Sequence, residues 1–379
     1  MVKSKDNEIL FYAVGDVAPF REDPTSIFKD VTRTLNRADI AFCQLEINLS
    51  ERGTRLPQAR HTTRANPKTA RAIKEAGLRV VSFAGNHCMD WGQEAFFDTI
   101  EALKGEGISV IGVGKNIEEA RKPAILESKG SRVAFLAYNT ILPMGYWAEA
   151  NRPGCAPMRA WTLYEQIEHD QPGTPCRIDT FPHREDLAAM CEDIKKAKTQ
   201  ADVVILSMHW GIHFIPAVLA TYQRDMAHVA IDSGADLILG HHAHILKGIE
   251  VYKGKAIFYS LCNFAVDLPF TKEHAESKSF KEIQKLNPDW IPDFECLYNF
   301  PTDSQKTIIV KCIISDGAIK SVSFLPTYVN KKTSQPEILT SKDKRFGEVV
   351  RYMEEVTRNE GIDTNYNISG DEVVLLNFA

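Results

Sequence analysis

Short apolar runs alternate with amphipathic segments along most of the chain. Runs of strand length lie at residues 9–14, 40–45, 79–83, 109–113, 133–138, 203–208, 237–239 and 256–261. Apolar positions recur at helical spacing in residues 93–104, 187–194 and 222–232. Gly105 directly follows the first of these segments and is a typical helix stop. This alternation predicts an α/β fold in which helices cover a sheet.

Two stretches break the alternation. Residues 141–182 are rich in proline, contain Trp147 and Trp161, and show no period. Long loops of this kind are usually functional or disordered, and the aromatic residues argue against disorder. We interpret this stretch as an ordered insertion, a lid near the active site. The alternative is a peripheral excursion that stabilises a homodimer. Residues 267–296 form the second irregular stretch.

The C-terminal part has a pattern of its own. Residues 307–314 and 319–325 flank an Asp316-Gly317 turn, which predicts a β-hairpin. A last amphipathic helix follows and ends at Gly361. We expect residues 1–325 to form one domain, with insertions at about 141–182 and 267–296. Residues 326–379 are expected to form an extension that packs on the same domain.

Composition and charge exclude several classes of protein. The chain has 379 residues and a net charge of -5, which provides no basic surface for nucleic acid or an anionic membrane. No apolar run approaches the length of a membrane span. No apolar stretch precedes Ile9, so we expect no signal peptide. The eight cysteines are scattered without a CxxC pair, which favours a reduced, cytoplasmic protein.

Residues with metal-binding side chains follow five of the predicted strands. They are Asp16, Glu46 with Asn48, Asn86 with His87, His209, and the histidines of the string Gly240-His241-His242-Ala243-His244. Ligands bind beyond the carboxyl ends of strands in open α/β sheets, so these side chains are expected to converge. Carboxylates, amides and imidazoles together suit manganese, iron or zinc. There are enough of them for two ions, with Glu46 as the bridge.

Each of these signals has an ordinary structural explanation when it is taken alone. A Gly-Asp pair after a strand is usually a turn, and Asn86 could cap a left-handed turn. Glu46 could be an exposed charge, and His209 could be a half-buried histidine beside Trp210. The ordered set, with each member at a strand end, favours the metal site.

The same residues resemble a known protein family. The chain is similar to the poly-γ-glutamate capsule-synthesis, or CapA-type, branch of the calcineurin-like metallophosphatase superfamily over residues 9–265. The resemblance is carried by GDV (15–17), QLEINL (44–49), AGNHCMDWG (84–92), HWG (209–211), GHHAH (240–244) and FYSLCNF (258–264). It implies a four-layer α/β/β/α sandwich, with a dinuclear centre of two divalent transition metals.

The resemblance also implies a role for each matching residue. Asp16 would bind the first metal and Glu46 would bridge both, where the wider superfamily has Asp. Asn86 and His209 would bind the second metal, and His242 and His244 would close one coordination sphere each. His87 would donate a proton or stabilise an oxyanion. His241 would lie outside the ligand set, although it could exchange roles with His242.

Two positions depart from the wider superfamily. The histidine two residues after the first aspartate is replaced by Ala18, and we expect Asn48 to supply the missing ligand. The acid directly after His87 is missing, and we expect Asp90 to support that histidine instead. The CapA-type branch shares both departures, so they weaken a simple phosphomonoesterase interpretation more than the metal site.

The mechanism expected for such a centre is hydrolysis by metal-activated water, with His87 and Asp90 as the catalytic pair. The bond would be a phosphoester or an amide, including a γ-glutamyl bond, in a small or oligomeric anionic substrate. Substrate contacts are expected from Arg60, His61, Arg64, Trp210 and Asn263. Two alternatives stay open. One is a non-catalytic accessory protein that binds an anionic polymer, and the other is a di-iron oxygenase on the same ligands.

Overall fold

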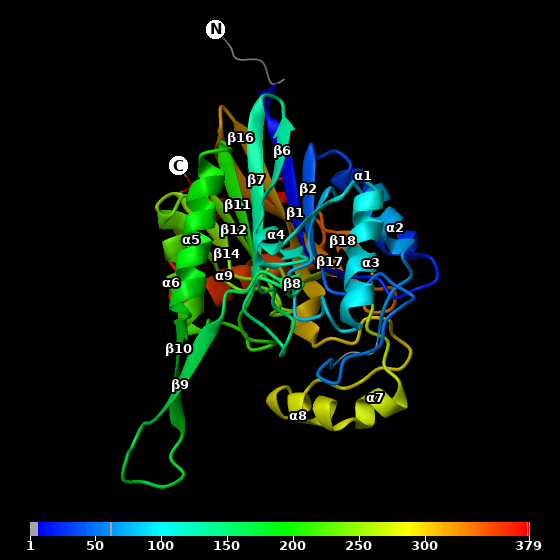
Figure 1. The fold of residues 1–379 in the computed structure, drawn as a ribbon, viewed down its shortest axis with the longest axis vertical. Coiled ribbons are helices and arrows are strands. Elements are labelled where there is room, and N and C mark those ends of the chain that lie inside the picture. Colours follow the sequence, from blue (N-terminus) through cyan, green and yellow to red (C-terminus); the bar gives the residue numbers. More distant parts are fainter. Residues whose placement is uncertain (1–6, 61–62, 377, 379) are drawn as a thin grey trace.

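The computed structural model describes residues 7–60, 63–376 and 378, and two β-sheets face each other at its centre (Figure 1). The first sheet has the strand order β19-β20-β17-β16-β1-β2-β3-β4, with β15 beside β1 and β18 beside β17. Its strands are β1 (Ile9–Ala18), β2 (Ile40–Leu45), β3 (Val80–Ser82), β4 (Ser109–Ile111), β15 (Asn263–Val266), β16 (Lys306–Ser315), β17 (Ala318–Val329), β18 (Pro336–Ile338), β19 (Tyr366–Ser369) and β20 (Glu372–Leu375).

The second sheet has the order β13-β14-β12-β11-β7-β6. Its strands are β6 (Ala124–Ser128), β7 (Ser131–Asn139), β11 (Val203–His209), β12 (Leu237–His241), β13 (Ile249–Tyr252) and β14 (Lys255–Phe258). Two further antiparallel pairs lie outside the main sheets: β5 (Val113–Gly114) with β8 (Gly154–Cys155), and β9 (Ala160–Gln166) with β10 (Cys176–Pro182).

Helices cover the outer faces of both sheets. The helices are α1 (Thr32–Leu35), α2 (Thr69–Glu75), α3 (Gly92–Gly105), α4 (Ile117–Ala120), α5 (Arg184–Lys198), α6 (Thr221–Asp232), α7 (Lys272–Glu276), α8 (Lys278–Leu286) and α9 (Lys344–Asn359), with 3-10 turns η2 (Pro24–Phe28) and η3 (Thr302–Gln305). Figure 1 shows α2 and α3 outside the first sheet and α5 and α6 outside the second. The predicted four-layer sandwich is confirmed. Within the described residues, no helix has both the length and the apolar character needed to cross a membrane.

The alternation of side chains along each strand builds two separate cores. In β11, Ile205 faces the core between the sheets, whereas Leu206 and Met208 belong to the core beneath α5 and α6. Across the first of these cores, the rings of Phe42 and Phe135 stack with centroids 6.4 Å apart. Because both faces of these strands are covered, they appear in the sequence as continuous apolar runs.

The parallel strands of both sheets end at one edge of the sandwich. Strands β1 to β4 are mutually parallel, and so are β7, β11, β12 and β14. In Figure 1 these carboxyl ends point downward, toward α7 and α8 on one side and the β9–β10 hairpin on the other. Side chains placed just after the strands therefore meet between these two protrusions.

The C-terminal hairpin and helix form as predicted. Strands β16 and β17 pair over their whole length, and Asp316 and Gly317 turn between them with φ of 50° and 68°. Helix α9 ends just before Gly361, whose φ is 71°. The segment after residue 325 also adds β18 and β20 to the edge of β17. The division into a domain and an extension at residue 325 stays a prediction.

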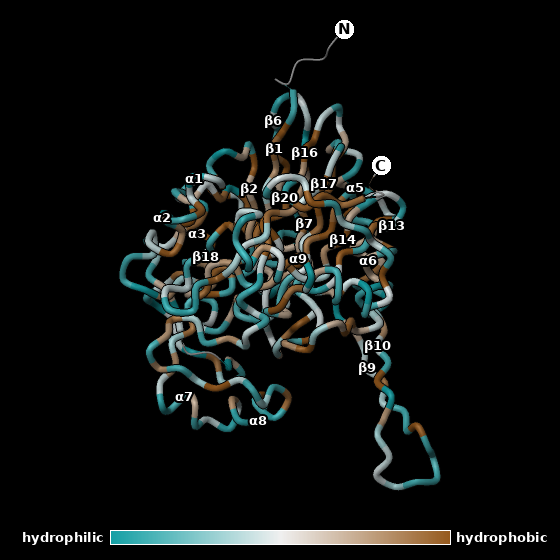
Figure 2. Tube along the Cα trace, turned by 180° about the vertical axis from the view of Figure 1, so that it is seen from behind, coloured by the Kyte–Doolittle hydropathy of each residue, from teal (hydrophilic) through white to brown (hydrophobic). Residues whose placement is uncertain are grey.

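The 141–182 segment is only partly irregular. Residues 160–182 form the β9–β10 hairpin, which projects away from the body (Figure 2). Both of its faces carry exposed apolar side chains, with Trp161 on one face and Tyr164 on the other. The sequence therefore lacks the inside-outside alternation that marks a strand in a sheet. The part before residue 160 packs on the body.

Candidate metal centre

The predicted ligands lie together at the shared edge of the two sheets. They come from the ends of five strands or the loops after them: Asp16 from β1, Glu46 from β2, Asn86 from β3, His209 from β11, and both His242 and His244 from β12. Asp16 and His209 are fully buried, and Glu46, His242 and His244 are nearly so. The convergence expected from the sequence is therefore what the fold produces.

One group of ligand atoms combines Asp16, Glu46 and His244. One nitrogen or oxygen atom from each lies within 4.8 Å of the other two. His244 Nδ1 is 3.6 Å from Asp16 Oδ2, and His244 Nε2 is 3.8 Å from Glu46 Oε2. Two carboxylates and one imidazole could hold a divalent cation here.

A second group combines Glu46 with His209 and His242 within the same limit of 4.8 Å. His209 Nε2 is 3.2 Å from Glu46 Oε1 and 2.6 Å from Asn86 Oδ1. The amide oxygen of Asn86 thus faces the same point as the imidazole. Glu46 is the member that the two groups share.

Burial sets the charge state of these side chains. It raises the pKa of Glu46 well above its ordinary value, and the negative charges of Asp16 and Asp90 raise it further, so a cation beside Glu46 would favour its charged form. Burial, reinforced by neighbouring histidines, lowers the pKa of His209 and His242 well below that of free imidazole. The imidazoles are therefore neutral, with lone pairs available for a metal.

An unpaired atom supports the same conclusion. Glu46 Oε1 is buried and has no hydrogen-bond partner. A buried acceptor without a partner is costly, and a divalent cation at this point would remove that cost. The residues present fit a metal ion by charge, ligand type and position.

The backbone around the ligands is tightly constrained. A side chain on Gly15 would place its Cβ 1.9 Å from the carbonyl oxygen of Cys262, which accepts the Asp16 N–H at 3.0 Å. His242 and His244 both have positive φ, 86° and 54°, which is unusual for histidine. Such conformations cost energy and cluster at functional sites, where the surrounding structure enforces them.

His87 is linked to a buried acid beside the ligand groups. Its Nδ1 lies 2.7 Å from Asp90 Oδ2, and its Nε2 lies 3.0 Å from Asn86 Nδ2. An amide nitrogen donates, so His87 Nε2 is the acceptor and Nδ1 carries the proton. The other oxygen of Asp90 accepts a hydrogen bond from Tyr146. The catalytic pair predicted from the sequence is thus in contact.

His244 is oriented by a neutral chain on the opposite side. Its Nδ1 is 2.8 Å from Asn263 Oδ1, and Asn263 Nδ2 donates to the hydroxyl of Tyr298 at 2.8 Å. That hydroxyl donates in turn to the carbonyl of Ser304. The bond to Asn263 places the proton of His244 on Nδ1 and leaves Nε2 as a possible ligand.

Of the three histidines in the string, His242 and His244 belong to the candidate ligand groups, and the choice between His241 and His242 as ligand stays a prediction. His241 belongs to neither ligand group; its Nδ1 lies 3.1 Å from Asp16 Oδ1 and its ring packs on Phe42. His213 is a site residue that the sequence prediction missed. Its Nε2 lies 3.2 Å from His242 Nδ1. His213 lies four residues after His209 in the sequence, and this short spacing is the signal by which it could have been predicted as a site residue.

Three predicted contacts do not fit the structure. Trp210 was expected to bind substrate, but it is fully buried and donates to the carbonyl of Tyr259 at 3.0 Å. It follows His209 directly, so it faces the helices instead of the other sheet. Asn263 is also fully buried, and its amide is engaged with His244 and Tyr298. Asn48 was expected as a ligand, yet its amide bonds the backbone of Cys88 and Trp91.

The basic loop is placed only in part. Arg64 lies over the ring of Trp91 at 4.2 Å and donates to the carbonyl of Arg52 at 2.7 Å, so it holds the loop together. Arg60 is exposed. His61 lies outside the described residues. The contacts of this loop with substrate stay a prediction.

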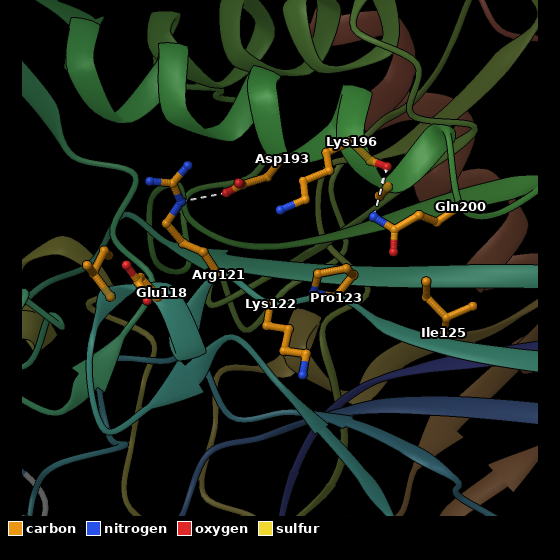
Figure 3. Close-up of a pocket in the computed structure, with 10 residues that line it drawn as sticks. Glu118, Arg121, Lys122, Pro123, Ile125, Asp193, Lys196 and Gln200 are labelled. Carbon is orange, nitrogen blue, oxygen red and sulfur yellow. Dashed lines mark hydrogen bonds and ion pairs between the residues drawn. The ribbon is translucent and has the colours of Figure 1, made fainter.

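A surface cavity of about 680 Å³ lies away from these groups, between β6 and α5 (Figure 3). Arg121 and Asp193 form an ion pair on its wall at 2.5 Å, and Tyr138 also donates to Asp193 at 2.7 Å. None of the ligand-group residues lines this cavity.

Comparison with known proteins gives the chain a family. The family model described as "Bacterial capsule synthesis protein PGA_cap" matches residues 7–268. The capsule biosynthesis protein CapA of Bacillus anthracis is 32% identical over 208 residues, which are 55% of this chain and 45% of that protein. A Mycobacterium tuberculosis protein named "Probable polyglutamine synthesis accessory protein" is 28% identical over 235 residues, 60% of this chain and 56% of that protein. The chain spans about half the length of these relatives.

Among solved structures, PhoD superimposes with 10% identity and a TM-score of 0.38, covering 93% of this chain and 78% of PhoD. The family match covers β1 to β15, and so includes every member of the two ligand groups. The chain belongs to the bacterial capsule synthesis protein family, PGA_cap.

Proposed function

We propose that this protein is a hydrolase that uses two divalent transition metals, manganese, iron or zinc, at its strand-end site. One observation carries the proposal: Glu46 belongs to both ligand groups, so a single carboxylate can bridge two ions. Asp16 and His244 would hold the first ion. His209, His242 and Asn86 would hold the second. Asn48 is left out, because its amide is engaged with the backbone.

Two such ions activate a bound water near neutral pH and stabilise developing negative charge. The chain's own contribution is proton transfer and orientation. His87 Nε2 accepts a hydrogen bond from the amide of Asn86, whose oxygen faces His209, so this nitrogen lies beside the second ligand group as a hydrogen-bond acceptor. It can take a proton and return it to a leaving group. Asp90, bonded to Nδ1, stabilises the imidazolium that forms.

The substrate is proposed from the family. The names of the relatives refer to capsule biosynthesis and polyglutamine synthesis. Together with the resemblance to the poly-γ-glutamate branch, they suggest an anionic substrate with an amide or phosphoester bond. Arg60 and Arg64 could contact its oxygens. A cytoplasmic location and a homodimer stay predictions.

A second candidate function is an accessory role, because one relative is named an accessory protein. Such a protein would keep the ligand groups and bind an anionic polymer without cutting it. The buried His87–Asp90 pair favours hydrolysis, because binding alone does not require a proton carrier at that position.

The experiment compares metal content and turnover in four proteins loaded with Mn²⁺ or Zn²⁺. We expect His87→Ala to keep its metal but to cleave bis(p-nitrophenyl) phosphate or γ-glutamyl-p-nitroanilide about 10²- to 10⁴-fold more slowly than wild type. His209→Ala should lose metal and activity together. His169→Ala, an exposed histidine in the β9–β10 hairpin, is the matched control and should behave as wild type.

Metal-loaded wild type that cleaves neither substrate would contradict the hydrolase and support the accessory role. Wild type that takes up no divalent metal would contradict both.

A further inference from the structure

A buried tyrosine from the 141–182 segment contacts the catalytic pair. Tyr146 is fully buried, and its hydroxyl lies 2.7 Å from Asp90 Oδ1. Burial and the negative charge of Asp90 raise the pKa of Tyr146 far above its ordinary value, so the hydroxyl stays protonated and donates. Asp90 thus uses one oxygen for Tyr146 and the other for His87.

The backbone of Tyr146 is fixed on both sides. Its N–H donates to the carbonyl of Pro143 at 3.1 Å, and its carbonyl accepts the N–H of Cys155 at 2.9 Å. Gly154 passes so close that a Cβ there would lie 2.4 Å from the same carbonyl oxygen. The hydroxyl therefore has little freedom to leave Asp90.

The loops around Asp90 are joined to the same segment. The N–H of Leu56 donates to the backbone carbonyl of Asp90 at 2.8 Å. Two residues later in that loop, Gln58 donates to the carbonyl of Met144 at 2.7 Å. Asp90 is thus held by its own loop, by the 55–59 loop and by the inserted segment.

We infer that Tyr146 is a positioning residue: it fixes the Asp90 carboxylate, and through it holds the His87 ring with Nε2 toward Asn86. This inference rests on the proposed function. Through the contact between Tyr146 and Asp90, the part of the 141–182 segment that precedes residue 160 belongs to the reaction site. Residues 160–182 take no part in it.

The chain offers a matched control. Tyr138 is also buried, and it also donates to an aspartate, Asp193, at 2.7 Å. Asp193 lines the cavity of Figure 3, and Tyr138 belongs to the core beneath α5 and α6. Tyr138→Phe removes the same chemical group from the interior without touching Asp90 or His87.

The first measurement does not need activity. In Zn²⁺-loaded protein labelled with ¹⁵N-histidine, the Nδ1–H resonance of His87 is identified by its loss in His87→Gln. We expect a downfield, slowly exchanging signal in wild type, because the proton is bonded to a buried carboxylate. Tyr146→Phe should move or broaden this signal, whereas Tyr138→Phe should leave it unchanged.

The second measurement is turnover of bis(p-nitrophenyl) phosphate. Tyr146→Phe should lower kcat about tenfold, with KM and metal content unchanged. Asp90→Asn should also lower kcat, and the double variant should be no slower than Asp90→Asn, because both changes act on one contact.

An unchanged His87 resonance in folded Tyr146→Phe would overturn the inference, and so would independent, multiplicative losses in the double variant. If wild type cleaves nothing, the hydrolase proposal fails, and the resonance alone decides whether Tyr146 positions His87. If Tyr146→Phe does not fold, Asp90→Asn decides: an unchanged His87 resonance there overturns the inference.

Discussion

The two sides of the site are held by chains that look alike but differ in charge. On one side, Tyr146 donates to Asp90, which bonds His87. On the other, Asn263 bonds His244 and donates to Tyr298. We call these the acidic relay and the neutral relay.

The difference in charge separates two tasks. A buried carboxylate beside His87 can stabilise the imidazolium that forms when this side chain takes up a proton, which suits a residue that carries a proton. An amide beside His244 fixes the tautomer without adding charge, which suits a residue that must keep a lone pair for a cation. Both relays end in a buried tyrosine from a segment without a regular period in the sequence.

Breaking the neutral relay should lower the affinity for metal and leave kcat of the metal-loaded protein unchanged. We expect Asn263→Ala to weaken metal affinity about 10- to 100-fold, because His244 loses the bond that sets its tautomer. At saturating Mn²⁺, kcat should stay close to that of wild type. Titration with Mn²⁺ and steady-state kinetics measure the two effects separately.

The control for this change is Asn299→Ala. Asn299 is a buried amide that directly follows Tyr298 in the chain, and it bonds the backbone of Leu268 and Cys296 and not a ligand. If Asn263→Ala lowered kcat at saturating metal as strongly as Tyr146→Phe, the two relays would not have separate tasks.

Glu360, a buried acid that belongs to neither relay, is expected to make the stability of the folded protein depend on pH. Burial raises the pKa of Glu360 from 4.5 to about 7, and its Oε2 accepts the N–H of Gly248 at 2.8 Å. The folded protein keeps this proton to higher pH than the unfolded chain. The contribution to stability is therefore full below 4.5 and is lost as the pH rises through about 7.

The unfolding free energy of metal-free wild type decreases as the pH rises through this range. We expect this decrease to be smaller in Glu360→Gln, by on the order of 1 kcal/mol. Urea unfolding at a series of pH values measures it. Glu354→Gln, an exposed glutamate on α9, should leave the slope as it is in wild type. An equal change in both variants would show that Glu360 does not set the slope.

The smallest effect is expected from the projecting hairpin. Replacing residues 164–178 by two glycines removes the outer part of β9 and β10 and the turn between them, but keeps Thr180, which bonds Thr221 of α6. We expect unchanged metal content and turnover of a small substrate, and a melting temperature within about 2 °C of wild type. A large loss of activity would place the hairpin in the site, as the lid interpretation has it.

The sequence identified the ligand side of the site because strand ends are visible in it. A buried apolar run that stops at Asp16 or His209 marks both the strand and the polar residue at its end. Trp210 was misassigned because neighbouring residues in an extended chain face opposite sides. Knowing which side faces the partner sheet requires the packing of β11 between two cores.

The relays were less accessible to sequence reasoning. Asp90 was found because it lies close to His87 in the chain. Tyr146 and Tyr298 lie 56 and 35 residues from the side chains they contact, in stretches without a period. A buried tyrosine looks like ordinary core there, and only the fold shows which polar group its hydroxyl meets.

The central claim is that Glu46 joins two metal ions in one site. The most direct test counts and locates the ions by anomalous diffraction from crystals of the Mn²⁺-loaded protein. We expect two peaks, one beside Asp16 and His244 and one beside His209 and His242, with the Glu46 carboxylate between them. A single peak, or a second peak away from Glu46, would contradict the shared site.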